Sequence, residues 1–538
     1  GAQGFGDMGP MKQTVSANIV DVVNRRIFGG TVHINHGRID RIEPSDQSYD
    51  TYLIPGFVDA HVHIESSMLV PTEFARLASV HGTVATVSDP HEIANVLGVR
   101  GVEYMIDNAN ASPMKFYFGA PACVPATCFE TAGASLGVEE VSELLGRPEI
   151  RYLSEVMNFP GVISGDEDMH GKIAAARRLN KRVDGHAPGL RGEPARQYFA
   201  AGVETDHECY TLEEAIEKLS LGVKILIREG SAARNFNALW PLMRDHADAC
   251  MLCTDDMHPD NLLRGHIDRL VAQAVAHGVD PMNALQCACV NPVRHYGLDV
   301  GLLRAGDPAD FAEIRDLNSF QVLRTWIDGK LVAAAGQSLT ESGGIHSINH
   351  FDAVEKKPAD FFVPRKSQVR IIEAADGQLV TQSTTGSPQD PDVLKLTVVE
   401  RYGNGNIGIG FIRGFGLKRG AIASSVAHDC HNIVAVGADD DALCRAVNAV
   451  IRNRGALVVI DGSAEHVLPL PIAGIISDRQ GQDVAHQYGE LDRLAKGLGS
   501  ALHAPFMTLS FMALLVIPSL KLSDRGLFDG ERFELVEL

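Results

Sequence analysis

The sequence is short of positive charge and of long apolar runs. It contains 48 Lys and Arg residues against 68 Asp and Glu residues, which gives a formal net charge of −20. Nucleic acids and anionic membrane surfaces select proteins with excess positive charge, so we expect neither as a partner. The most apolar stretch, residues 506–520, is too short for a membrane-spanning helix and contains a proline near its end.

Cysteine is also sparse, and its placement is irregular. An odd number of cysteines, nine, without regular spacing is more typical of a reducing cytoplasm than of a secreted disulfide scaffold. Cys250 and Cys253 form a C-x-x-C pair, but their small and apolar neighbours favour a buried strand over a zinc or redox site. The N-terminus lacks the basic and apolar segments of a signal peptide. We therefore expect a cytoplasmic protein.

The 538 residues are enough for several domains, and the sequence pattern changes along the chain. Residues 1–53 alternate as short strands, with turns at Gly29–Gly30 and His36–Gly37. Residues 297–345 return to short strands and are expected to complete the same small β-sandwich domain. Residues 346–538 are predicted to form a separate C-terminal α/β domain, with strands near 394–403, 406–417, 420–437 and 455–462 and a helix near 439–453.

Between these parts, residues 54–296 alternate β-rich runs with amphipathic helical stretches, such as 71–82, 168–180 and 211–222. The predicted strands occupy residues 53–64, 82–90, 115–124, 150–158, 181–189, 202–209, 222–230 and 249–256. Eight strand–helix units in a segment of this length are typical of a (β/α)₈ TIM-like barrel, which makes the fold class α/β.

Histidines and acids recur near the ends of the predicted barrel strands. His61 and His63 are two residues apart in an extended segment, so their side chains point the same way. Single residues of this kind are often satisfied polar groups or helix caps. Six at matching ends of five strands instead predict one metal-binding pocket at the barrel mouth. They are His61, His63, Glu155, His186, His207 and Asp255.

The order His-x-His, carboxylate, His, His, Asp resembles the amidohydrolase superfamily of metal-dependent hydrolases. Longer motifs are similar to the bacterial adenine deaminases, and the resemblance spans nearly the whole chain. The motifs are PGFVDAHVHIESSM (55–68), SDPHEIANVLG (88–98), PACVPA (121–126), DGHAPGL (184–190), IREGSAARN (227–235), MLCTDD (251–256), VAHDCHNIV (426–434) and LPLPIAGIIS (468–477). The resemblance implies hydrolysis of adenine to hypoxanthine and ammonia.

The resemblance also implies a pair of divalent metal ions. One would be held by His61, His63 and Asp255, the other by His186 and His207, with Glu155 bridging them in the place of the carboxylated lysine of many relatives. Metal-bound water has a pKa near neutrality, so the expected nucleophile is a metal-bridged hydroxide that attacks C6 of adenine. Mn²⁺ or Fe²⁺ is expected, and Zn²⁺ also suits imidazole and carboxylate ligands.

Further roles follow from positions near the same strand ends. Asp255 is the candidate proton shuttle, and Asp89 and His91 are candidate proton-relay or ordering residues. An alternative for Asp89 is a helix cap beside a polar turn. We assign substrate recognition to residues that offer donors and acceptors for a purine edge, namely Glu92, Arg228, Glu229 and Ser231.

Three questions stay open at this point. His428 and His431 in HDCH either reach over the barrel mouth, bind an extra metal or, as we favour, are stabilised loop histidines. The main rival function is hydrolysis of a cyclic amide, as in hydantoinase-like or dihydroorotase-like enzymes, and a third reading is a non-enzymatic metal protein. The zinc nucleobase deaminases of another fold need H-x-E and P-C-x-x-C motifs, which are missing here.

We also expect a homo-oligomer, with a dimer as the working assumption.

Overall fold

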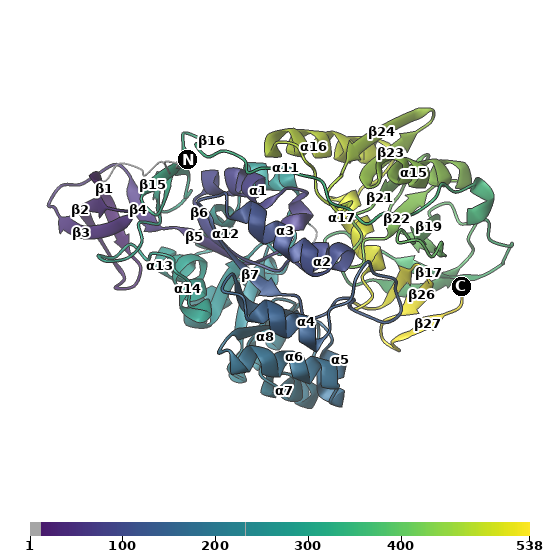
Figure 1. The fold of residues 1–538 in the computed structure, drawn as a ribbon, viewed down its shortest axis with the longest axis horizontal. Helices are drawn as coiled ribbons and strands as arrows, with labels where there is room; N and C mark the ends of the chain where they lie inside the picture. The colour runs from purple at the N-terminus through teal and green to yellow at the C-terminus, as the bar shows by residue number, and fades with distance from the viewer. Residues whose placement is uncertain (1–11, 232) are drawn as a thin grey trace, which may run out of the picture.

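The computed structural model describes residues 12–231 and 233–538, and its three parts follow one another along the longest axis (Figure 1). A small β-domain lies at one end, the barrel lies in the middle, and the C-terminal domain lies at the other end. No helix among the described residues combines the length and apolarity needed to cross a bilayer. The expectation about a signal peptide concerns the first residues, of which 1–11 lie outside the described part.

The small β-domain is built from both sides of the barrel segment, as predicted. Its eight strands form one sheet in the order β16-β15-β14-β13-β4-β1-β2-β3. A separate apolar core that includes Ile19, Phe311 and Trp326 joins the two halves. The strands are β1 (Lys12–Asp21), β2 (Arg26–Asn35), β3 (Arg38–Pro44), β4 (Tyr52–Pro55), β13 (Phe311–Ile314), β14 (Val322–Ile327), β15 (Lys330–Ala334) and β16 (Gln337–Ser338).

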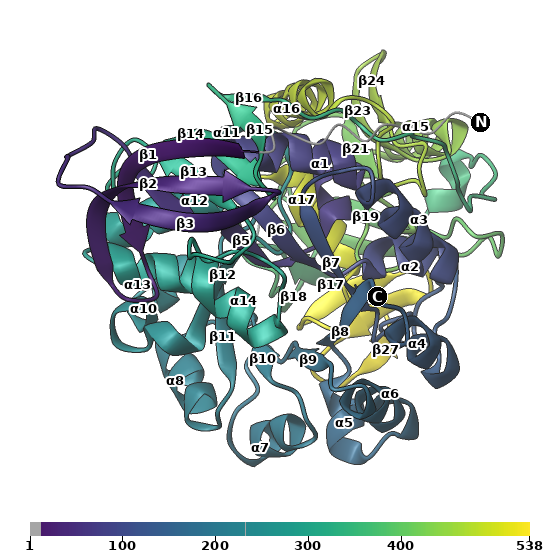
Figure 2. The ribbon, with the colours of Figure 1, turned by 60° about the vertical axis from the view of Figure 1, so that its left-hand side comes forward.

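The eight predicted barrel strands are present, and neighbouring strands within the barrel sheets run parallel. A hydrogen bond from Glu204 N to Val183 O joins β9 to β10, and a bridge between Val62 and Asp255 joins the ends of the curled sheet. Figure 2 shows helices around the outside of these strands. The strands are β5 (Phe57–Val62), β6 (Thr83–Ser88), β7 (Lys115–Ala120), β8 (Ile150–Val156), β9 (Arg182–Gly185), β10 (Thr205–Asp206), β11 (Lys224–Arg228) and β12 (Cys250–Cys253).

The first predicted strand, 53–64, is two strands in the structure. β4 belongs to the small sheet and β5 to the barrel, so the chain changes sheets at Gly56 rather than at residue 53. A Cβ on Gly56 would lie 2.3 Å from Val84 of β6. Only glycine lets the backbone pass this close to the neighbouring strand. Because residues on both sides of Gly56 are apolar, the sequence pattern does not reveal that one strand ends and another begins here.

Some of the helices begin at a side chain that caps them. Asp166, Thr211 and, in the C-terminal domain, Asp439 accept a backbone N–H of the first turn, as N-cap residues do. The barrel helices are α1 (Pro71–Ala78), α2 (His91–Leu97), α3 (Val99–Ala109), α4 (Val138–Leu145), α5 (Phe159–Ser164), α6 (Glu167–Arg178), α7 (Gly192–Ala200), α8 (Leu212–Ser220), α9 (Phe236–Leu239), α10 (Leu242–Asp245), α11 (Pro259–Arg264), α12 (Ile267–Ala276), α13 (Pro281–Leu285) and α14 (Asn291–Tyr296).

The C-terminal domain contains a second eight-stranded sheet, in the order β18-β17-β20-β19-β22-β21-β23-β24. Its strands are β17 (Val369–Glu373), β18 (Gln382–Gly386), β19 (Leu394–Val399), β20 (Ile407–Arg413), β21 (Ala421–Ser424), β22 (Ile433–Gly437), β23 (Ala456–Asp461) and β24 (Ala464–Pro469). The remaining elements are α15 (Asp440–Asn453), α16 (Gly481–Gly497), α17 (Pro505–Ser510), β25 (Leu520–Ser523), β26 (Gly526–Asp529) and β27 (Glu534–Val536). The predicted strand 420–437 is thus a hairpin, with HDCH in its turn.

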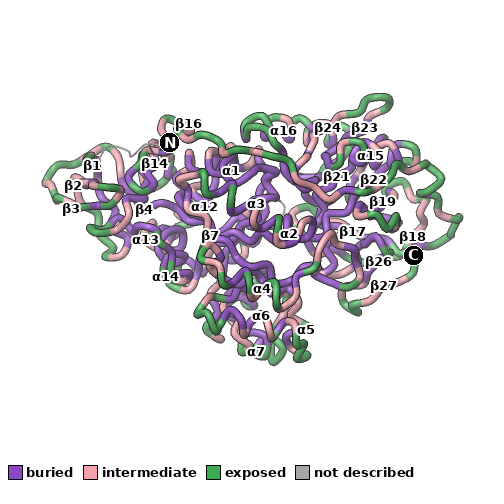
Figure 3. The backbone as a smooth tube through the Cα atoms, viewed as in Figure 1, coloured by how far each residue is buried: buried purple, intermediate pink, exposed green. Residues whose placement is uncertain are grey.

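The C-terminal domain packs tightly on the barrel. One apolar core contains side chains of both, and Figure 3 shows buried chain continuing from the barrel into this domain. Polar contacts add to it: the Asp524 carboxylate accepts hydrogen bonds from Thr131 N at 3.0 Å and Thr131 Oγ1 at 2.7 Å. The two parts therefore share one interior at the side of the barrel mouth.

A buried ion pair supports one site-bearing strand. Lys218 of α8 donates to Asp206 of β10 at 2.6 Å and to Ala187 O at 2.7 Å, and both charged side chains are buried. We predict that Lys218→Met destabilises the protein by about 3–5 kcal/mol, because it leaves a buried carboxylate unpaired. Urea denaturation followed by circular dichroism measures the change. Lys496→Met, which removes an exposed pair with Asp492, is the control and should cost about 1 kcal/mol or less.

Candidate active site

The six side chains predicted to bind metal meet at the carboxyl ends of the barrel strands. Each lies at or just after the end of β5, β8, β9, β10 or β12, and every one is buried. Parallel strands present their carboxyl ends at one rim, so residues far apart in sequence become neighbours. Asp255 has a φ of 59°, in the left-handed region, and exchanges backbone hydrogen bonds with His61 and His63. This turn aims its carboxylate at the two histidines.

Glu155 lies between the two halves of the cluster. Its Oε1 is 3.1 Å from His63 Nε2, while its Oε2 is 2.9 Å from His186 Nδ1 and 3.2 Å from His207 Nε2. Asp255 Oδ1 lies 3.1 Å from Nε2 of both His61 and His63. Each Glu155 oxygen therefore faces a different set of imidazoles, which is the arrangement that a bridging carboxylate requires.

The donor set fits a pair of divalent cations. His61 Nε2, which faces the Asp255 carboxylate, is buried and forms no hydrogen bond with the described residues. His61 nevertheless approaches Asp255 closely, so the two groups crowd one another without the alignment of a hydrogen bond. Unsatisfied buried nitrogens cost free energy, and a metal ion removes that cost by taking the lone pair. Neutral imidazoles and carboxylates are suitable ligands for Mn²⁺, Fe²⁺ and Zn²⁺.

The charges in the cluster compensate one another. Burial disfavours the charged form of His63, but the Asp255 and Glu155 carboxylates outweigh it and hold its pKa well above the usual value. Burial also disfavours the charged form of His207, but the nearby Glu155 carboxylate outweighs burial and raises the pKa of His207. Burial would raise the pKa of Glu155, yet His207 and His186 hold it well below its usual range. Protonated imidazoles thus supply the positive charge that bound cations would otherwise supply.

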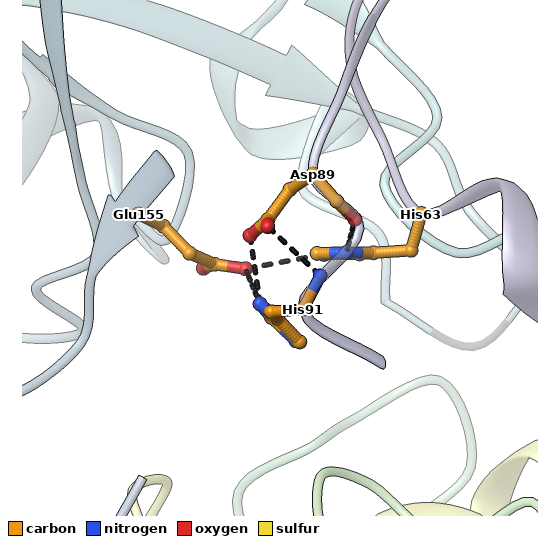
Figure 4. A group of neighbouring side chains, drawn as sticks. All are labelled: His63, Asp89, His91 and Glu155. Carbon is orange, nitrogen blue, oxygen red and sulfur yellow. Dashed lines mark hydrogen bonds and ion pairs between the residues drawn. The ribbon is translucent and has the colours of Figure 1, made fainter. Parts of the chain in front are cut away.

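Asp89 and His91 lie beside His63 and Glu155 of this cluster (Figure 4). His63 Nδ1 lies 3.1 Å from the carbonyl oxygen of Asp89 and donates to it, which leaves Nε2 of the neutral ring free to bind a metal. The Asp89 carboxylate contacts His91 Nδ1 at 2.7 Å, and the same nitrogen is 3.5 Å from Glu155. Asp89 therefore orients two histidines, one through its backbone and one through its side chain.

Of the three residues expected after the seventh strand, only Arg228 reaches the cluster. Its Nη1 donates to Asp255 Oδ2 at 2.6 Å. Glu229 pairs with Arg234 at 3.4 Å, and Ser231 Oγ contacts Asn261 and the backbone of His258. Glu229 and Ser231 lie beyond the end of β11, and their contacts are with neighbouring loop and helix residues and not with the cluster.

Sequence reasoning missed two acids in the cluster. Glu208 lies 3.2 Å from His207 Nε2 and 3.3 Å from His186 Nδ1, and both of its oxygens accept from Arg228. Asp256 groups with His63 and Glu92, their possible ligand atoms lying within 4.8 Å of one another, and it accepts a hydrogen bond from Ser66 Oγ at 2.5 Å. Each directly follows a predicted ligand, so strand alternation placed it on the opposite face. The strands end before these positions, and alternation no longer applies.

Glu92 contacts the HDCH turn of the C-terminal domain. Its Oε1 lies 2.6 Å from His428 Nδ1, and its Oε2 contacts His431 Nε2. The two histidines therefore lie against the barrel and are not isolated loop residues. Cys250 and Cys253, by contrast, are buried free thiols of β12, as their apolar surroundings indicated.

Comparison with known proteins agrees with this geometry. The sequence model of the amidohydrolase family matches residues 52–332, and that of the adenine deaminase C-terminal domain matches residues 366–534. An adenine deaminase from Sulfurovum sp. is 56% identical, over 97% of this chain and 99% of that protein. The chain belongs to the adenine deaminase family. Adenine deaminases from Salinibacter ruber and Methanosarcina acetivorans are 55% and 50% identical, over 98% and 97% of this chain and 99% and 98% of those proteins.

The metal content of this adenine deaminase family member is directly measurable. We predict about two divalent ions per chain in the parent protein and about one fewer in His186→Ala, since that change removes a ligand of one site only. Elemental analysis after exhaustive dialysis gives the count. His246→Gln, at an exposed histidine, should keep the parent value. A parent count near zero after manganese loading would contradict the two-ion site.

Metal binding should also release protons. The pKa values of His63 and His207 lie well above their usual value without metal, so both rings are protonated at neutral pH and must lose protons to become ligands. Metal affinity should therefore fall as pH falls. Isothermal titration of metal-free protein with Mn²⁺, in buffers of different ionisation enthalpy, counts the released protons. A count of zero at pH 7 would contradict this charge assignment.

Proposed function

We propose that this chain hydrolyses adenine to hypoxanthine and ammonia. The observation that carries the proposal is the buried cluster of four histidines and two acids at the barrel mouth. The chain is also similar, over nearly its full length, to proteins named adenine deaminase. A structural metal site would be closed by its protein ligands, whereas this cluster also holds Arg228, Glu208 and His91 as further polar groups.

The six predicted ligands would hold two divalent ions, with Glu155 in the bridging position. When bound, such ions lower the pKa of coordinated water toward neutrality and so supply a nucleophile. Mn²⁺ or Fe²⁺ is our first choice, and Zn²⁺ is also compatible with the ligands. Glu155 is held in place by histidines on both sides, so its two oxygens stay directed at the two halves of the site.

Asp255 is the proposed proton carrier. One of its oxygens faces His61 and His63, while the other accepts from Arg228 at 2.6 Å. Burial would raise the pKa of Asp255, but the neighbouring histidines hold it well below its usual value. Asp255 is the carboxylate that lies between the candidate metal-binding histidines and Arg228, so it is placed to take a proton from the attacking water. It then passes the proton toward the exocyclic nitrogen, which leaves as ammonia.

The residues behind Glu155 serve protonation of the ring. Attack at C6 requires electron density to move onto N1, and a proton at N1 assists it. His91 lies between Asp89 and Glu92, at 2.7 Å and 3.0 Å, and its pKa is raised because these acids and Asp429 outweigh burial. It is the cationic group of the site best placed to share a proton with the purine, and Glu92 is its partner on the substrate side.

Compartment and assembly stay predictions from the sequence. The irregular, unpaired cysteines favour a reducing cytoplasm, and the chain is expected to form a homodimer. The net charge of −20 continues to favour a small-molecule substrate over a nucleic acid or membrane partner.

Ammonia release tests the proposal. Manganese-loaded protein should release ammonia from adenine and should leave hydantoin and dihydroorotate unopened. Glu155→Gln should lower kcat by roughly 100-fold or more, because the neutral amide weakens both halves of the metal site. Glu139→Gln, an exposed change on α4, is the matched control and should leave kcat unchanged. Ring opening of a cyclic amide without deamination of adenine would instead favour the rival function.

A further inference from the structure

Three residues of the C-terminal domain enter the candidate active site. His428, Asp429 and His431 lie in the turn between β21 and β22, and all three are buried. They fall within residues 366–534, which match the adenine deaminase C-terminal domain, and outside the amidohydrolase match at 52–332. The C-terminal domain therefore supplies part of the candidate site.

The turn holds Glu92 through hydrogen bonds. A carboxylate only accepts, so His428 Nδ1 at 2.6 Å and His91 Nε2 at 3.0 Å both donate to its Oε1. His431 Nε2 donates to Oε2. Glu92 thus accepts from three imidazoles, one supplied by the barrel and two by the C-terminal domain.

The tautomer of His431 argues against an extra metal ion here. Its Nδ1 accepts a hydrogen bond from Ala427 N at 3.0 Å, so the neutral ring carries its proton on Nε2. Burial lowers the pKa of His431, which favours this neutral form. A metal at Nε2 would need the lone pair that the proton occupies. His431 is therefore a positioning residue for Glu92.

His428 and Asp429 leave two buried polar atoms without partners. His428 Nε2 and Asp429 Oδ2 form no hydrogen bond with any part of the chain that the structure describes. Burial lowers the pKa of His428, but Glu92 outweighs it and raises the pKa to about 9, so Nε2 carries a proton. Phe511 stacks on the ring at 4.5 Å and fixes its direction. A fixed donor and a fixed acceptor thus lie unsatisfied on adjacent residues.

His91 relates these atoms to the metal cluster. Its Nδ1 lies 3.5 Å from Glu155 Oε1, and its Nε2 lies 3.4 Å from Asp429 Oδ1. One imidazole ring therefore separates the Asp429 carboxylate from the bridging glutamate. The Asp429 carboxylate therefore lies on the far side of His91 from the candidate metal cluster.

We propose that His428 and Asp429 bind the imidazole-ring side of the purine, with His428 Nε2–H donating to a ring nitrogen and the Asp429 carboxylate accepting the ring N–H. This inference rests on the proposed function. Adenine has one ring N–H, on its five-membered ring, and a substituent at N9 removes it. The C-terminal domain therefore selects the free base over N9-substituted purines such as nucleosides.

Steady-state kinetics with adenine and 9-methyladenine test the assignment. Asp429→Ala and His428→Ala should raise KM for adenine roughly 10- to 100-fold, as loss of a hydrogen bond to a charged group does, with a smaller change in kcat. Asp429→Asn keeps an acceptor oxygen and should recover part of the loss. His503→Gln, at an exposed histidine of the same domain, should match the parent. The parent should prefer adenine over 9-methyladenine at least 10-fold, and Asp429→Ala should reduce that preference.

The outcomes separate the two proposals. A parent protein that does not deaminate adenine would overturn the proposed function and this inference together. An active parent whose Asp429→Ala variant keeps the parent KM, or which uses 9-methyladenine as well as adenine, would overturn this inference alone. Loss of a metal ion from either alanine variant would also overturn it, since the residue would then be a ligand. The analogue comparison needs only the parent protein, so a variant that fails to fold leaves the test intact.

Discussion

Charge compensation inside the barrel mouth is the constraint on which this structure depends. Glu155, Glu208 and Asp255 are buried within a few ångströms of one another, and an unpaired carboxylate cannot remain ionised in such a place. Histidines from the ends of three strands, β5, β9 and β10, and Arg228 provide the opposite charge. The same crowding makes the site suitable for divalent cations, because a cation can replace the protons on those imidazoles. The side chains that balance charge in the fold are therefore the same ones that are proposed to bind metal.

Contacts from neighbouring residues hold those side chains in place. The backbone oxygen of Asp89 fixes the ring of His63, and Arg228 ties Asp255 to Glu208. Farther out, Lys218 neutralises Asp206 beside His207. Asp89 follows β6, Arg228 ends β11 and Lys218 lies on α8, so these groups come from different parts of the barrel. The precision of the rim thus comes from the closed sheet, which places rigid strand ends at fixed distances around one axis.

The C-terminal domain extends the rim rather than standing apart from it. It shares an apolar core with the barrel, and its hairpin turn brings two imidazoles to Glu92. The barrel by itself offers the proposed metal ligands, whereas the hairpin adds polar groups beyond them. This division explains how a barrel fold can be adapted to one substrate. The barrel keeps the reactive cluster, and the added domain changes the polar groups that lie beside it.

The order of residues in the sequence by itself determined a large part of this protein. Strand–helix alternation predicted the barrel, and polar residues at strand ends predicted the six-residue cluster, because parallel strands always bring their carboxyl ends to one rim. Only the tertiary structure decided the parts that depend on local departure from alternation or on distant contacts. Glu208 and Asp256 join the cluster because their strands end early, Glu229 turns away, and Gly56 divides one apolar run between two sheets. His428 meets Glu92 across 336 residues of chain, and no local pattern records which loop will lie over a barrel mouth.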